Sequence, residues 1–388
     1  MRTLALDLGK NSIDWCEVKE GRVIGRGRVQ NMQSLRPVLD VGEGPMRIGF
    51  EACREALHVH EVMLSWGHQP QVFDTTRVRR LAGIGEHGRK NDRIDAERLA
   101  LALEREHMVF AHVLSEDGRR LRELQELHRA LVQTRKRLTI HARGILRGRG
   151  IDLPGCAIED FSHHLRKAEL PDTMRQLVSS LLAPLESVQP EIARVDLQIH
   201  ELCVGQRDPV VTRLASIPGV SLLVASAFIS AIDDPFRYKN ASQISSFLGL
   251  CPREESTGGR HKLGSITKQG NVYARCMLVQ AAWCVIRSRD TKDTLVRWAH
   301  KTSQRRGRMR AAVAVARRLS RIMWSMWVNG TFYDPRGMTA LDERDVDEQA
   351  KSAGLASKRG ELKLSAQQRA HQRRLQASLK LSEGRTSP

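Results

Sequence analysis

Five short apolar runs separated by turn residues occupy the first 74 positions, and their order constrains the fold more than any other feature. We predict strands over residues 3–8, 12–18, 22–29, 47–51 and 71–74. We predict helices over residues 55–66, 76–82 and 94–104. A three-strand meander followed by alternating helices and strands predicts a mixed α/β sheet with helices packed on it.

Two of these strands end in an acidic residue, and two further acids follow in a predicted helix. Asp7 and Glu51 end their apolar runs, and Asp92 and Asp95 share a helix face because they are three positions apart. Converging carboxylates are hard oxygen ligands, which could hold two Mg²⁺ ions against a phosphate. A simpler interpretation makes Asp7 a turn cap, and Asp92 and Asp95 first-turn residues favoured by the helix dipole. The strand-end positions of Asp7 and Glu51 favour the metal site.

Asp7-Leu8-Gly9 also fits the first phosphate loop of the actin and sugar-kinase fold, which begins with a similar meander. That fold requires a second Asp-x-Gly loop late in the chain and a glycine-rich adenosine motif. Neither is visible in the sequence, so we do not favour this alternative.

The formal net charge is +19, from 63 Lys and Arg against 44 Asp and Glu. Such an excess predicts attraction to polyanions, with nucleic acid first; a basic ribosome-associated or membrane-surface protein is the alternative. Basic residues cluster in 119–149 and 301–310, and one-signed clustering favours nucleic acid over an ordinary solvated face. From these clusters we predict that Arg135, Lys136, Arg137, Arg305 and Arg306 contact the sugar-phosphate backbone of a nucleic acid.

A seven-residue repeat marks the basic segment 119–149 as a long helix. The repeat consists of Leu124, Leu131, Leu138 and Ile145, with Leu121 and Leu127 adding to the stripe. Together with a second amphipathic helix over about 174–202, it predicts a helical hairpin or coiled coil. Thr134 and His141 make the repeat imperfect.

We expect four parts in the chain. They are a nuclease domain at 1–110, a helical hairpin at 111–205, a mainly α domain at 206–333 and a charged, partly disordered tail at 334–388. No apolar stretch reaches the ~18 residues of a membrane span. Seven scattered cysteines without a Cys-x-x-Cys pair predict reduced thiols in a cytoplasmic protein.

Two motifs in the third part, residues 206–333, could bind phosphate. Pro218-Gly219 separates two predicted helices, as in a helix-hairpin-helix whose backbone amides hold a DNA phosphate; a plain tight turn is equally consistent. A loop with Ser256 as a possible nucleophile follows, and its glycines and cations could admit a phosphate. The loop residues concerned are Gly258, Gly259, Arg260, Lys262 and Lys268. From these residues alone a flexible basic loop is favoured, because nothing distinguishes Ser256 from Thr257, Ser265 or Thr267.

Taken in order, these motifs resemble the DEDD transposases of bacterial insertion sequences, in the one-ten group and its eleven-eleven subgroup. The resemblance rests on Leu-Asp-Leu-Gly-Lys, Gly-Phe-Glu-Ala, Lys-Asn-Asp-Arg-Ile-Asp-Ala, Ile-Pro-Gly-Val, Ser-Thr-Gly-Gly and Ile-Thr-Lys-Gln-Gly-Asn. It covers about residues 2–335. One departure is Cys53-Arg54-Glu55, where relatives usually have Thr-Gly and an aromatic residue.

The resemblance implies a RuvC-like (RNase-H-like) N-terminal domain, a coiled-coil middle and a C-terminal transposase domain. It implies Mg²⁺ on Asp7, Glu51, Asp92 and Asp95, and Ser256 as the nucleophile in a transient phosphoserine link. It also implies a bridge RNA that pairs with donor and target DNA, and dimers or tetramers in which one subunit's serine completes another's acidic site. We therefore expect an RNA-guided DNA recombinase. The alternatives are a Holliday-junction nuclease that uses water, and a non-catalytic nucleic-acid-binding protein.

Overall fold

A computed structural model describes residues 2–40, 44–74, 92–105, 110–205, 209–254, 263–336 and 340–341. The chain divides into two compact units, Met1–Leu114 and Ser115–Pro388, each considered by itself below. The four-part division expected from the sequence remains a prediction. The helix predicted over 76–82 and nearly all of the predicted tail lie outside the described residues.

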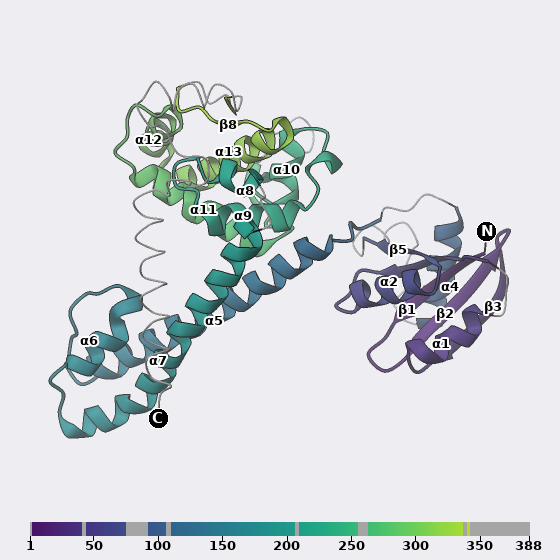
Figure 1. Ribbon diagram of the computed structural model, residues 1–388, viewed down its shortest axis with the longest axis horizontal. Helices are drawn as coiled ribbons and strands as arrows, with labels where there is room; N and C mark the ends of the chain where they lie inside the picture. Colours follow the sequence, from purple (N-terminus) through teal and green to yellow (C-terminus); the bar gives the residue numbers. More distant parts are fainter. Residues whose placement is uncertain are drawn as a thin grey trace. The chain divides into compact units, whose positions relative to one another are not determined.

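The first unit is built on a five-stranded mixed sheet, which confirms the architecture predicted from the strand order. Its strands are β1 (Thr3–Leu8), β2 (Ile13–Lys19), β3 (Arg22–Val29), β4 (Arg47–Glu51) and β5 (Gln69–Phe73). They lie in the order β3-β2-β1-β4-β5 (Figure 1). The meander β1-β2-β3 is antiparallel, whereas β4 pairs in parallel with both β1 and β5. The carboxyl ends of β1, β4 and β5 therefore share one edge of the sheet.

Strand alternation gives this sheet two apolar faces. One face packs against α1 (Met32–Leu39) and α2 (Ala56–Ser65), and the other against α4 (Asp92–Glu104). The predictions of α2 and α4 are confirmed, but the sequence reasoning missed α1. The signal for α1 is Asn31, whose side-chain oxygen accepts a hydrogen bond from the Ser34 amide at 2.9 Å.

The second unit contains the predicted helical hairpin. Its two long helices, α5 (Glu116–Arg147) and α7 (Asp172–His200), lie side by side (Figure 1). The short helix α6 (Phe161–Lys167) covers their far end, where Phe161 and Leu165 are buried with residues of both long helices. Pro184 and Pro190 lie inside α7, which continues through both.

The buried face of α5 differs from the predicted leucine stripe. Leu127 is 48% exposed, so its place in the stripe was wrong. Leu124, Leu131, Leu138 and Ile145 are partly buried at the sides. The buried face consists of Gly118, Leu121, Gln125, His128, Arg135, Thr139, Ala142 and Leu146. Gln125 is tolerated there because its amide bonds Ser226 at 3.2 Å and Ser230 at 2.7 Å on the facing helix.

The remaining helices gather at the other end of the hairpin around one large core (Figure 1). They are α8 (Pro209–Leu214), α9 (Leu222–Ile232), α10 (Ala241–Phe247), α11 (Val272–Arg287), α12 (Thr294–Arg306) and α13 (Arg308–Asn329). Shorter helices are η1 (Ile158–Asp160), the π-helix η2 (Glu201–Gly205) and η3 (Pro235–Arg237). Two short strand pairs complete the unit: β6 (Pro252–Glu254) with β7 (Leu263–Ile266), and β8 (Phe332–Tyr333) with β9 (Ala340–Leu341). None of the helices in the described part of the chain is both long and apolar enough to span a membrane.

Gly49 of β4 provides a test of how closely α4 packs on the sheet. A Cβ at this position would clash with the Phe73 ring and lie 2.8 Å from a Leu103 methyl group. We expect Gly49→Ala to destabilise the first unit by about 1–3 kcal/mol, because neither buried side chain has space to move. Hydrogen exchange of peptides from residues 2–74 measures this loss.

Gly144→Ala is the matched control. Apart from its chain neighbours and the local helix backbone, no atom lies within 4 Å of a Cβ built at Gly144 in α5, so we expect this substitution to stabilise the helix by roughly 0.5–1 kcal/mol. Wild-type exchange in the Gly49 variant would show that α4 does not lie tightly on β4.

Candidate functional site

Asp7 and Glu51 lie at the same level on neighbouring parallel strands. Leu6 is paired with Phe50 in the β1–β4 register, and the two acids are the next residues along each strand. Asp7 alternates with Ala5, and Glu51 is paired with Phe73 on β5. Ala5 and Phe73 both belong to the core beneath α4. Both acids therefore project to the α4 face at the carboxyl edge of the sheet.

Helix α4 runs against the direction of β1, which brings its first turn towards the same edge. At the end of α4, Glu104 accepts a hydrogen bond of 2.7 Å from the amide of Gly21. Gly21 follows β2 at the opposite end of β1 from Asp7, as the Thr3–Val18 pairing shows. The first turn contains Asp95, which is only 7% exposed. Asp92 begins the helix, and its side chain lies outside the described residues.

Asp14 is a further acid at this edge that the sequence analysis did not select. It is paired directly with Asp7 across β1 and β2 and is 2% exposed. Arg28 on β3 bonds its carboxylate at 3.0 and 3.1 Å. Directly opposed like charges destabilise a strand pair, so the guanidinium offsets the repulsion between the two acids. The signal in the sequence was the alternation of Asp14 with the buried Cys16.

The donor set at this edge has the chemistry that a divalent cation requires, because carboxylate oxygens are the ligands that Mg²⁺ prefers. Among the described side chains, no group of three or more His, Cys, Asp or Glu converges closely enough to hold a metal ion. The side chain of Asp92 and residues 75–91 lie outside the described residues. The joint metal site of Asp7, Glu51, Asp92 and Asp95 remains a prediction.

Ser256 falls in the connection between β6 and β7. Glu254 is paired with Leu263 and Pro252 with Ile266, so the serine follows the paired part of β6 by two positions. Ser256, Gly258, Gly259, Arg260 and Lys262 themselves lie outside the described residues.

The base of this hairpin is closely packed. Two segments meet here, residues 247–249 and residues 268–270. Gly249 and Gly270 have φ values of +67° and +70°, and a Cβ on either would clash with the backbone of the other segment. The Arg275 guanidinium joins the two segments, donating to the carbonyls of Leu248 at 3.0 Å and Gln269 at 2.6 Å. Lys268 lies within the second segment with an exposed side chain and a φ of 57°.

The Pro218-Gly219 turn connects α8 to α9. Gly219 has a φ of +79°, and a Cβ there would lie 2.7 Å from the carbonyl oxygen of Ala281 on α11. Ser221 begins the next helix, its hydroxyl accepting from the Val224 amide at 3.3 Å. Close packing on α11 is sufficient to explain the glycine, and the predicted phosphate contact is not tested by it.

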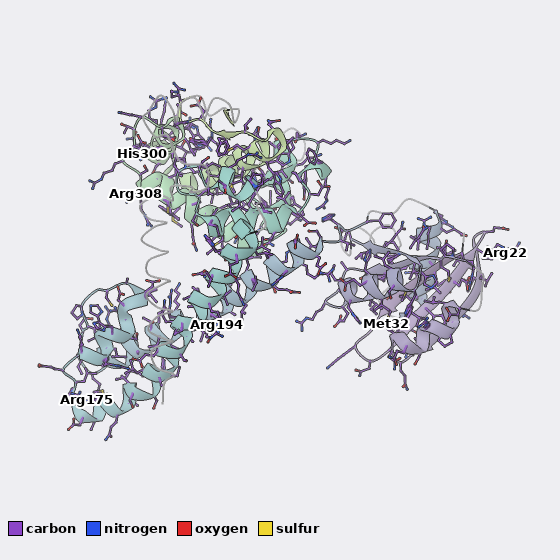
Figure 2. The ribbon with its side chains drawn as sticks, in the orientation of Figure 1. Arg22, Met32, Arg175, Arg194, His300 and Arg308 are labelled. Atoms are coloured by element: carbon purple, nitrogen blue, oxygen red, sulfur yellow. The ribbon has the colours of Figure 1, made fainter. Side chains whose placement is uncertain are left out.

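The two basic clusters were predicted to contribute five cations to nucleic-acid binding, and the structure gives one of them, Arg135, an internal role. It is 8% exposed and donates to Gln189 at 2.6 Å and Glu159 at 2.8 Å, so we do not retain it as a surface contact. Lys136 and Arg137 are exposed beside it. Arg305 and Arg306 are exposed at the end of α12, and Arg308 follows at the start of α13 (Figure 2).

Comparison with known proteins gives two matching family profiles. The profile of the transposase IS116/IS110/IS902 family matches residues 211–297, and a DEDD transposase profile matches residues 4–149. The DEDD transposase domain implies an RNase-H-like fold, with which the mixed sheet of the first unit is compatible.

Curated relatives match most of the chain. A probable family 20 transposase of Pseudomonas aeruginosa is 30% identical over 75% of this chain and 86% of its own length. The transposase for insertion sequence element IS1111A of Coxiella burnetii is 27% identical over 84% and 89%. The transposase for insertion sequence element IS1328 of Yersinia enterocolitica is 28% identical over 85% and 98%.

The reactivity of the Cys16 thiol tests whether α4 stays packed on the sheet beside the acidic edge. It is 1% exposed, and burial, with the nearby Glu97 charge, raises the pKa of its thiol to about 11. Because only the thiolate reacts, we expect iodoacetamide at pH 8 to modify Cys16 roughly 100-fold more slowly than an ordinary thiol, and burial to slow it further. Mass spectrometry of the native protein, with the exposed Cys276 as internal control, measures the ratio.

The raised pKa also sets a pH dependence. Between the ordinary thiol pKa and about 11, the folded chain keeps a proton that the unfolded chain loses. The Cys16 contribution to stability is therefore present below that interval and is lost as pH rises through it. Equal modification of Cys16 and Cys276 at pH 8 would show that α4 does not cover β2.

Proposed function

The chain belongs to the transposase IS116/IS110/IS902 family, and we propose that it moves an insertion sequence by Mg²⁺-dependent cutting and rejoining of DNA, with Ser256 as nucleophile. Family membership makes it a DNA transposase, an enzyme of phosphoryl transfer. The observation that carries the finer proposal is the register of β1 and β4, because it sets Asp7 and Glu51 side by side on the α4 face.

In this mechanism Asp7, Glu51, Asp92 and Asp95 would hold two Mg²⁺ ions. When bound, the ions would stabilise the negative charge that builds on the phosphate oxygens during transfer. The parallel strand ends and the first turn of α4 supply carboxylates from three elements of one compact unit. Hydrogen bonding of Asp14 to Arg28 limits the repulsion that a further acid would add next to Asp7.

The Ser256 hydroxyl oxygen forms a bond to phosphorus as the bond from phosphorus to one sugar oxygen breaks. The serine gives up its proton, and the departing sugar oxygen takes one, so the products are a phosphoserine link and a free hydroxyl end. A sugar hydroxyl of another DNA end then attacks the same phosphorus, and the serine is restored. Because each step exchanges one phosphate ester for another, the cycle needs no energy-rich cofactor.

We propose a bridge RNA as guide, in addition to the DNA of the element ends and target. The charge of +19 and the exposed Lys136, Arg137, Arg305 and Arg306 support binding to polyanionic backbones, while base pairing reads the sequence. We propose that the protein works in the bacterial cytoplasm, on nucleoid DNA.

We further propose that the protein acts as a homodimer or homotetramer, with α5 and α7 forming a coiled-coil region and residues 206–333 a C-terminal transposase domain. Asp7 and Glu51 belong to one compact unit, and the hairpin that contains Ser256 belongs to the other. We propose an active site in which the serine of one subunit meets the carboxylates of a second, as the family resemblance implies.

Replacing one proposed metal ligand should abolish recombination without unfolding the protein. For Asp7→Asn we expect recombination between donor and target plasmids in Mg²⁺ to fall by about 100- to 1,000-fold or more, because charge stabilisation at the phosphate is lost. Nucleic-acid binding should persist. Asp40→Asn, an exposed acid at the end of α1, is the matched control and should recombine normally. Undiminished recombination by Asp7→Asn would refute the metal role.

Replacing the proposed nucleophile should remove the covalent intermediate. We expect wild-type protein to form a protein–DNA adduct that survives a denaturing gel, and Ser256→Ala to form none. Ser265→Ala, on the neighbouring strand β7, should retain the adduct. An adduct in Ser256→Ala would assign the nucleophile elsewhere. Cleavage without any adduct in the wild type would favour water as nucleophile, and binding without cleavage a non-catalytic protein.

A further inference from the structure

Phe236, in the short turn η3, is unusually exposed for an aromatic residue. Among large apolar side chains in the described ranges it is as exposed as any, at 74%. The residues on either side are well packed: Pro235 is buried and Tyr238 is half-buried. The aromatic ring therefore stands out from an ordered corner, and burial in the core does not explain it.

Hydrogen bonds fix this corner on both sides of Phe236. Trp324 of α13 donates its indole N–H to the Pro235 carbonyl at 2.9 Å. The Phe236 amide donates to the Asp234 carboxylate at 2.9 Å, and the Arg237 guanidinium donates to the Ile232 carbonyl at 3.2 Å. Because the backbone is held at these points, the position from which the ring projects is fixed, which lowers the entropy cost of binding a partner.

The charges around the ring favour a polyanion. Arg237 and Lys239 are exposed on the C-terminal side, and Arg237 also lies over the Tyr238 ring at 5.3 Å. The two acids that precede the corner are engaged with the protein: Asp233 accepts from Ser115, and Asp234 from the Phe236 amide. Both cations are therefore exposed to solvent, although Arg237 keeps its bond to the Ile232 carbonyl, and both acids accept hydrogen bonds from backbone amides.

Helix α13 continues the positive surface from this corner. Arg317 and Arg321 are seven and three positions before Trp324, so all three lie on one helix face. Trp324 itself contacts the corner through Pro235. Arg321 is exposed on this face.

Packing contacts also connect this corner to the base of the Ser256 hairpin. The rings of Tyr238 and Phe247 lie 5.4 Å apart between centroids. Phe247 ends α10, and its carbonyl oxygen lies against Gly270 at the hairpin base. A nucleotide held at Phe236 would thus be bound by the same compact unit that carries the base of the Ser256 hairpin.

We propose that Phe236 is a stacking platform for an unpaired nucleobase, with Arg237 and Lys239 binding the adjacent phosphates. An exposed aromatic ring beside cations is the arrangement that binds single-stranded nucleic acid, because every base offers a flat π face. The partner is therefore a single strand of any sequence, such as the DNA opened next to the cut or a loop of RNA. This proposal rests on the proposed function and adds a binding site to it.

The test uses full-length protein and oligonucleotides that contain 2-aminopurine, whose fluorescence falls when the base stacks. Matched single-stranded DNA, single-stranded RNA and duplex DNA are titrated into wild type, Phe236→Ala, Phe236→Trp and the control Leu64→Ala. Leu64 is 53% exposed on α2 in the other unit. Circular dichroism and sedimentation check folding and oligomeric state.

We expect Phe236→Ala to lose the quenching and to bind a single strand about 5- to 100-fold more weakly, with duplex binding unchanged. Phe236→Trp should keep both signals, and Leu64→Ala should match wild type. The effect on the DNA or the RNA strand identifies which one supplies the base. Wild-type quenching and affinity in Phe236→Ala would overturn the platform while leaving the proposed function intact.

Two other outcomes separate the remaining explanations. If Phe236→Ala changes the oligomeric mass but not the single-strand affinity, the ring contacts a second copy of the chain and the platform is wrong. If the wild type binds none of the three nucleic acids, the proposed function fails together with the platform.

Discussion

The parallel pairing of β1 with β4 is the constraint on which the first unit depends. It aligns Asp7 with Glu51, and it sets Ala5 beside Gly49, whose missing side chain leaves room for Phe73 and Leu103. That room lets α4 pack closely on the sheet with its first turn at the acidic edge. The close packing of α4 on the sheet and the spacing of the acids thus follow from the same two strands. A shift of the strand register by one residue would move Asp7 to the other face of the sheet.

The second unit holds the segment that we propose to be reactive by different means. Here the Ser256 hairpin has only two short strands, so its base depends on side-chain and glycine contacts more than on a sheet. Arg275, itself 8% exposed, holds the carbonyls of Leu248 and Gln269 together, and Gly249 and Gly270 let the two segments approach. Breaking the hydrogen bonds of a buried guanidinium costs free energy, so Arg275 stabilises the base of this hairpin.

Sequence reasoning predicted those parts whose burial is decided locally. Alternation gave the strands of the sheet, and a long helical period gave α5 and α7. It failed where tertiary partners satisfy polar groups: Gln125 and Arg135 are buried because Ser226, Gln189 and other distant residues receive their hydrogen bonds. The acidic pattern pointed to Asp7 and Glu51 on chemistry alone. Ser256 gained its role from family resemblance, because adjacent hydroxyls look equivalent in the sequence.

The fate of the arginines shows why net charge predicts a partner but does not locate its binding site. Arg28 bonds Asp14, Arg135 bonds Glu159 and Gln189, and Arg275 bonds two carbonyls, so these cations stabilise the fold. Counting them towards an interface overstates its strength, because a phosphate would have to displace existing hydrogen bonds. Lys239 and Arg237 are exposed, and Arg237 gives only one hydrogen bond to the fold, to the Ile232 carbonyl, so a phosphate displaces less there. Exposure and existing hydrogen bonds, which depend on the fold, therefore decide which cations can meet a phosphate.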